Sequence, residues 1–169
     1  MKKRLLLLNC MAASLFFTGC MGYKLGGGKP AGIDTVAMAP VINETAEPAI
    51  EIQITHAMRQ QIQFDGRLKL VNERKNADAV IELTLTDYQL MPIAYRSELR
   101  TTPDLYRLRI TGVAELRKIS TGEVISTSQT FGEATFEFLN DLTTSKRDAL
   151  PRAAQEIATY MLEDLIDQW

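Results

Sequence analysis

Residues 105–118, Leu-Tyr-Arg-Leu-Arg-Ile-Thr-Gly-Val-Ala-Glu-Leu-Arg-Lys, alternate between two kinds of side chain. Apolar or small side chains occupy the even positions from Tyr106 to Leu116, and most odd positions are charged or polar. A period of two predicts a β-strand with one buried face and one polar face. This is the clearest strand in the chain, and the remaining elements are placed around it.

The segments on either side of this strand extend the sheet. Ser120-Thr121-Gly122 is typical of a tight turn, so residues 123–131 or beyond should form a second strand, antiparallel to the first. That strand is rich in serine and threonine, which favours a face that is solvated or that meets a polar partner. Residues 77–90 predict a long strand before it, and residues 91–104 a polar loop. In the strand at residues 77–90, the side expected to be the more polar comprises Val80, Glu82, Thr84, Thr86 and Tyr88.

Two amphipathic helices accompany these strands. The first follows Pro48 and ends before Gly66, a residue suited to a helix C-cap; its apolar side consists of Ile50, Ile54, Ala57, Met58, Ile62 and Phe64. The second occupies the carboxyl-terminal end. There Ser145-Lys146-Arg147-Asp148 resembles a capping box, but Pro151 places the expected start of the regular helix near Leu150.

Short strands at residues 34–40 and 67–71 complete the order strand–helix–strand–strand–strand–strand–helix. This order predicts an α+β fold, in which a small mixed or antiparallel β-sheet carries two amphipathic α-helices packed on one face.

The amino-terminal end has the layout of a secretory signal peptide. Lys2, Lys3 and Arg4 precede an apolar run at residues 5–17, which is shorter than the ~20 residues that span a bilayer. Thr18-Gly19-Cys20 then resembles the lipobox of bacterial lipoproteins, although Phe17 stands where leucine is usual. The alternative is an ordinary signal peptide followed by an unrelated cysteine.

The lipobox resemblance implies that residues 1–19 are removed and that Cys20 receives acyl chains such as palmitate. Several acyl chains would hold the protein firmly in a membrane. Met21 follows, whereas aspartate at that place retains lipoproteins at the inner membrane, so the resemblance implies the outer membrane. Residues 20–33 are rich in glycine and predict a flexible tether, and residues 34–169 predict a single folded domain.

Composition limits the possible functions. None of the 21 acids and three of the 19 bases lie in the signal segment, so the remaining chain has five more acids than bases. This balance argues against general nucleic-acid binding. Cys10 leaves with the signal and Cys20 carries lipid, so no disulfide is expected. His56 is the single histidine, and no phosphate loop, metal motif or nucleophile elbow is present. We therefore expect no enzyme activity, no metal and no cofactor.

Three segments resemble the LptE family of lipopolysaccharide-assembly lipoproteins. The first is the start Cys20-Met21-Gly22-Tyr23-Lys24-Leu25, with Met21 where the family often has glycine. The second is Val41-Ile42-Asn43-Glu44-Thr45, which leads through Pro48 and Glu51 into a helix. The third is Gly66-Arg67-Leu68-Lys69-Leu70-Val71, followed by Ala77-Asp78-Ala79-Val80-Ile81.

This resemblance implies a lipid-anchored, periplasm-facing protein of the lipopolysaccharide export machinery at the cell outer membrane. Such proteins act as plug and assembly partner of the LptD β-barrel and contact lipopolysaccharide. The family fold, two helices on a small sheet, agrees with the order of elements above. A competing function is that of another outer-membrane lipoprotein, such as a periplasmic activator of a cell-wall synthase. The short tether favours a partner at the membrane itself.

A cationic stripe supplies the candidate binding residues. Arg107, Arg109 and Arg117 alternate along one strand face, and Arg96, Arg100 and Lys118 are expected to flank them. Guanidinium groups could pair with lipid A phosphates or with acids that line the barrel. The alternative interpretation is an ordinary solvated sheet face.

Overall fold

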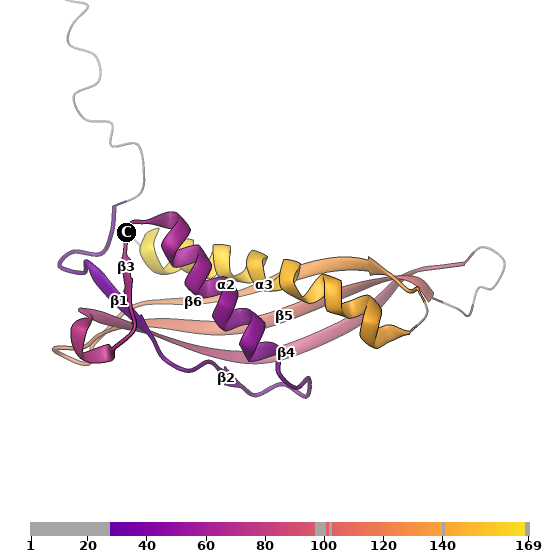
Figure 1. Ribbon diagram of the computed structural model, residues 1–169, viewed down its shortest axis with the longest axis horizontal. Coiled ribbons are helices and arrows are strands. Elements are labelled where there is room, and N and C mark those ends of the chain that lie inside the picture. The colour runs from indigo at the N-terminus through magenta and orange to yellow at the C-terminus, as the bar shows by residue number, and fades with distance from the viewer. Residues whose placement is uncertain (1–27, 97–100, 102, 140, 168–169) are drawn as a thin grey trace, which may run out of the picture.

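The computed structural model describes residues 28–96, 101, 103–139 and 141–167. Within them one sheet is covered on one face by two helices (Figure 1), which confirms the predicted α+β fold. The elements are β1 (Thr35–Met38), β2 (Ile42–Asn43), α2 (Ile50–Asp65), β3 (Lys69–Val71), the short 3-10 helix η2 (Arg74–Asn76), β4 (Ala79–Tyr95), β5 (Pro103–Lys118), β6 (Val124–Glu137) and α3 (Leu142–Asp167).

The sheet is mixed, with the strand order β3-β1-β4-β5-β6, and β2 pairs with β4. β1 is parallel to both of its neighbours, because α2 carries the chain back along the helix layer before β3 begins. β4, β5 and β6 form an antiparallel meander. The strongly alternating stretch at residues 105–118 lies in β5, which is paired along nearly its whole length on both sides.

One strand is longer than its sequence pattern predicts, and another extends beyond residue 131 as the prediction allowed. β4 continues to Tyr95 through residues that were expected to begin a loop, and β6 continues to Glu137. Pro92 lies inside β4, opposite Tyr106. β2 pairs with β4 only as far as Leu85. Beyond that point the other edge of β4 has no partner strand within the described residues, so Pro92 removes no ladder hydrogen bond there.

α2 buries the expected side, with one exception. Ile50, Ile54, Ala57, Met58 and Ile62 are buried, whereas Phe64 is 85% exposed. The expected burial of Phe64 was wrong: it lies at the rim of the apolar side, about 20° around the helix from Ala57, and in the last turn of α2 before Gly66. Gly66 ends the helix as predicted: its φ is 72°, and its N–H donates to the Ile62 carbonyl at 3.2 Å.

α3 begins at Leu142, eight residues before the predicted start near Leu150. The capping residue is Asp141, whose carboxylate accepts the Thr144 N–H at 2.8 Å. This hydrogen bond lowers the pKa of Asp141. Ser145 is buried, and its hydroxyl donates to the Asp141 carbonyl at 2.7 Å. Pro151 lies inside the helix, where it removes one backbone donor, but the helix continues because its apolar side packs on the sheet.

The serine-rich strand β6 has two different faces. Its helix-facing side is made of small residues except for Phe136, and Ser126 and Ser128 are buried beneath α3. The Ser126 hydroxyl donates to the Leu165 carbonyl at 2.7 Å, and the Ser128 hydroxyl donates to the Asp164 carboxylate at 2.8 Å. These two serines are therefore neither solvated nor free for a partner, contrary to the sequence interpretation. Val124, Ile125 and Phe131 are the exposed large apolar residues of the strand.

The core lies between the sheet and the helices. Its largest fully buried side chains include Ile54, Met58 and Ile62 of α2, Ile81, Leu83 and Leu85 of β4, Leu108, Ile110 and Leu116 of β5, and Ile157 of α3. β1 and the carboxyl end of α3 lie at one end of the elongated molecule, and the end of β4 and the start of β5 lie at the other (Figure 1). Within the described residues, neither helix combines the length and the apolar character of a membrane span.

Candidate functional site

The side of the sheet that the helices leave uncovered is the candidate site, and we call it the open face. The strand register places on it Glu82, Thr84, Asp87, Gln89 and Met91 of β4, Arg107, Arg109, Thr111, Val113, Glu115 and Arg117 of β5, and Gln129, Phe131, Glu133 and Thr135 of β6. The open face is mainly polar, as the odd positions of residues 105–118 predict.

A β-bulge decides which residues of β4 reach the open face. Leu85 pairs with Gly112 but Asp87 pairs with Thr111, so Thr86 is an extra residue. The alternation reverses there, and Tyr88 pairs with Ile110 on the helix side. The placement of Tyr88 with the polar residues of β4 was therefore wrong. Burial, with a smaller contribution from the charge of Glu47, raises the pKa of Tyr88 to about 12.

Two arginines of the predicted stripe share one carboxylate. Glu133 on β6 lies 2.5 Å from Arg109 and 3.7 Å from Arg107, measured to Nε of each guanidinium. The Arg109 guanidinium carbon also lies 4.4 Å from the centre of the Phe131 ring, in a cation–π arrangement. The group formed by these two arginines and one acid keeps a net positive charge.

Arg117 forms more hydrogen bonds than Arg107 or Arg109, because all three of its guanidinium nitrogens donate one. Its Nε donates to Glu82 at 3.0 Å, one terminal nitrogen donates to Glu115, and the other donates to the Gly122 carbonyl at 3.0 Å. The hydrogen bond that Arg117 donates to Glu82, assisted by the charge of Glu115, raises the pKa of Arg117. Arg117 is thus held in place by its own strand and by β4.

The other predicted site residues do not lie beside these arginines within the part of the chain that the structure describes. Arg96 is exposed beyond the end of β4 and contacts Asp104 at 3.2 Å. Lys118 pairs with Ala79, so it points to the opposite side of the sheet from Arg117. Arg100 and Cys20 lie outside the described residues. The structure therefore brings together Arg107 and Arg109 at Glu133, whereas Arg117 lies eight residues further along β5 and pairs separately with Glu82 and Glu115.

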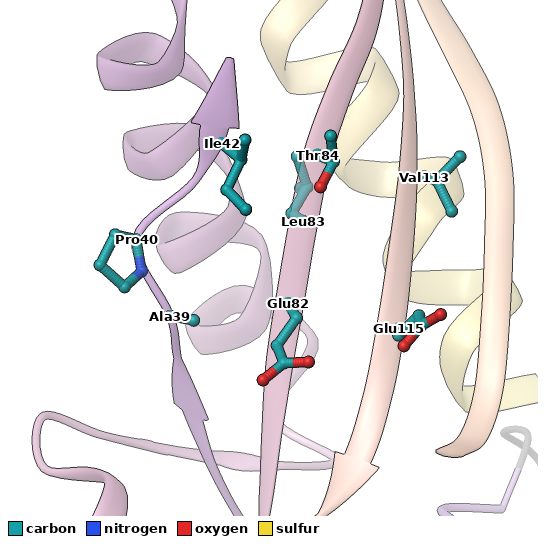
Figure 2. Close-up of a pocket in the computed structure, with 8 residues that line it drawn as sticks. All are labelled: Ala39, Pro40, Ile42, Glu82, Leu83, Thr84, Val113 and Glu115. Carbon is teal, nitrogen blue, oxygen red and sulfur yellow. The ribbon is translucent and has the colours of Figure 1, made fainter. Parts of the chain in front are cut away.

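A hollow of about 630 Å³ indents the open face beside β4 (Figure 2). Met38 pairs with Ile81, and Ile42 pairs with Thr84. The segment that joins β1 to β2 therefore has one more residue than the stretch of β4 beside it. Pro40 lies in this segment and lacks an N–H, so the chain leaves the sheet there. The hollow is lined by Ala39, Pro40, Ile42, Glu82, Leu83, Thr84, Val113 and Glu115. It can accept an apolar side chain between Ile42 and Val113.

The chemistry of the open face is that of a contact surface. No cluster of three metal-ligating side chains occurs within the described residues. His56 is exposed on the outer side of α2, away from the sheet. The open face thus presents arginine–carboxylate pairs, other polar side chains and the hollow beside β4.

Sequence reasoning missed Glu133 and Phe131, the partners of Arg109. A register counted directly from the turn at Gly122 would place Gly132 opposite Arg109. Ile125 is an extra residue in β6, because Leu116 pairs with Ser126 while Arg117 pairs with Val124. This bulge shifts the register by one and brings Glu133 beside Arg109. No local sequence signal marks it.

Comparisons with known proteins give one family and a recurrent fold. A family model described as LptE, lipopolysaccharide-assembly, matches residues 33–168. A comparison with curated protein sequences gave no match.

Among solved structures, the PelC dodecamer from Paraburkholderia phytofirmans is similar, with a TM-score of 0.53 and 16% identity over 84% of this chain and 95% of that one. A protein from Xanthomonas campestris has a TM-score of 0.53 and 12% identity over 80% and 88% of the two chains. At these identities the similarity concerns the fold alone.

Proposed function

This chain belongs to the lipopolysaccharide-assembly family LptE, and on that premise we propose that it is an outer-membrane lipoprotein that partners the LptD β-barrel and contacts lipopolysaccharide. Cys20 is the proposed site of lipid attachment. The observation that carries the proposal is the family match over residues 33–168, joined to a sheet that has one polar, uncovered face.

The open face suits a polar partner. A face meant for the core of a larger protein would be apolar, whereas this one carries arginine–carboxylate pairs and hydroxyl groups. The interior wall of an outer-membrane barrel is also polar. Because most charges on the open face are already matched within the chain, docking it against a polar wall leaves few unpaired charges.

Arg107 is the proposed phosphate contact on this face. It lies 3.7 Å from Glu133, its side chain is 39% exposed, and Arg109 lies closer to the same acid. A phosphate could therefore bind Arg107 without breaking the pair formed by Arg109 and Glu133.

The lipid anchor and the β4–β5 hairpin would lie at opposite ends of the molecule. β1, the first strand after the proposed anchor, lies at the end that holds the carboxyl end of α3 (Figure 1). A tether before Ile33, which is fully buried in the core, would keep that end near the membrane, since a flexible chain of about a dozen residues spans roughly 20 Å. The long strands would then extend away from the anchor into the partner.

Purification from outer membranes tests the partnership. The full chain, with a carboxyl-terminal affinity tag, is extracted in mild detergent, and we expect a stoichiometric LptD barrel to accompany it. Thr111→Arg in the middle of the open face should release the barrel, whereas Gln63→Arg on the exposed side of α2 should not. Recovery of a cell-wall synthase instead would favour the competing function. Recovery of the chain alone would contradict the proposal.

A further inference from the structure

A second cavity lies on the helix side of the sheet, remote from the open face. α2 and α3 diverge towards their amino-terminal ends (Figure 1). A cavity of about 170 Å³ near these ends is lined by Ile50 of α2, Leu150 of α3, Tyr88 of β4 and Leu108 of β5. Glu47, Thr143, Lys146 and Arg147 complete the lining. We call this space the interhelical cavity.

The apolar residues of the interhelical cavity belong to the core. Ile50 is 1% exposed and Leu108 is fully buried, while Leu150 and Tyr88 pack against the core from its edge. Tyr88 reaches this place because the bulge at Thr86 turns it away from the open face. These four side chains provide apolar surface that a hydrocarbon chain can contact. The interhelical cavity is therefore suited to a short stretch of hydrocarbon.

The charged residues of the cavity leave one cation unpaired. Lys146 contacts Glu47 at 2.6 Å, and both side chains are about three-quarters buried, so this pair is neutral. Arg147 is exposed, and none of the described residues forms an ion pair or a hydrogen bond with its side chain. The arginines of the open face differ, since each of them faces a carboxylate. An unpaired guanidinium beside an apolar cavity complements a molecule that has an acyl chain next to an anionic group.

We propose that the interhelical cavity binds a stretch of one acyl chain of lipopolysaccharide, while Arg147 pairs with a phosphate of the same molecule. This inference rests on the proposed contact with lipopolysaccharide and gives it a location. This contact lies on the helix side of the sheet and is separate from the one proposed for Arg107, so it leaves the open face available to the barrel.

Lipopolysaccharide binding by the full lipidated chain, in one detergent throughout, tests the proposal. Arg147→Glu should weaken binding about tenfold, because it replaces an attractive charge by a repulsive one. Lys69→Glu is the matched control: Lys69 is exposed, its side chain has no bonded partner within the described residues, and binding should not change.

The apolar half of the site requires its own variants. Leu150→Phe fills the cavity and should remove the preference for intact over deacylated lipopolysaccharide. Thr143→Trp narrows the entrance from an exposed position and should do the same, which keeps the test valid if Leu150→Phe does not fold. Circular dichroism establishes folding for each variant.

Each outcome decides a separate point. Folded variants that bind lipopolysaccharide as tightly as the wild type would overturn the cavity site and leave the proposed function standing. Equal competition by phosphatidylglycerol vesicles would overturn the assignment to lipopolysaccharide. If the wild type does not bind lipopolysaccharide, both the site and the lipid contact fail, and co-purification of the barrel decides the partnership independently.

Discussion

The contact between β6 and α3 gives the sharpest stability prediction, at Gly132. A Cβ atom added there would lie 2.2 Å from the Ala153 carbonyl oxygen and 2.6 Å from the Ile157 nitrogen. Both are backbone atoms of α3, so no side-chain rotation can relieve the clash. Gly132→Ala therefore has to push the helix away from the strand.

The expected cost follows from this geometry. Overpacking a core costs about 1–3 kcal/mol, and displacement of backbone belongs at the upper end of that range. Moving α3 also lengthens the hydrogen bonds from Ser126 and Ser128 to the helix, at about 1 kcal/mol each. We expect Gly132→Ala to lower the free energy of unfolding by about 3 kcal/mol or more.

Urea titration of the mature chain, followed by circular dichroism, measures this loss. Gly122→Ala is the matched control: its φ is 73° and nothing lies within 4 Å of the added Cβ, so only backbone strain of about 1–2 kcal/mol is expected. Gly112→Ala should fall between the two, since it meets the flexible Met161 side chain and the Thr84 carbonyl oxygen at 3.0 Å. The reasoning fails if Gly132→Ala is no more destabilising than Gly122→Ala.

Three further predictions concern the open face, the sheet edge and acid stability. Reversing Arg107 and Arg109 together to glutamate should weaken lipopolysaccharide binding at least tenfold without unfolding the chain; equal binding by the purified variant would remove Arg107 as a phosphate contact. At the edge of β6, Glu156 accepts the Glu133 N–H at 2.5 Å and Arg152 donates to the Thr135 carbonyl at 2.7 Å. Replacing both helix residues by alanine should produce concentration-dependent oligomers in light scattering, and a strictly monomeric double variant would contradict this. Finally, hydrogen bonds from Thr35 and Asp34 lower the pKa of Asp78 below 3.8. This stabilisation is present above pH 3.8 and is lost as pH falls through the lower folded pKa, so Asp78→Asn should reduce the acid sensitivity of the urea midpoint; an unchanged profile would speak against it.

Local patterns predicted much of the fold. The alternation at residues 105–118 predicted the strand that lies inside the sheet, and the cap at Gly66 predicted the end of α2. The common face of Arg107, Arg109 and Arg117 followed from the same alternation. Each of these depends on neighbours a few residues apart, whose geometry a strand or a helix repeats.

Other features depended on contacts between distant segments. The early start of α3 depends on Asp141 and the buried Ser145. The burial of Ser126 and Ser128 depends on how closely α3 approaches β6.

The sequence by itself determined the order of the main elements, apart from the short β2 and η2, together with the α+β class and the polar side of β5, because periodicity is a local property of the backbone. Only the tertiary structure decided that Glu133 lies beside Arg109 and that Tyr88 turns towards the helices. Both follow from single extra residues, Ile125 in β6 and Thr86 in β4. An inserted residue reverses every later side chain of its strand, and strand pairing, rather than composition, determines where it is accommodated.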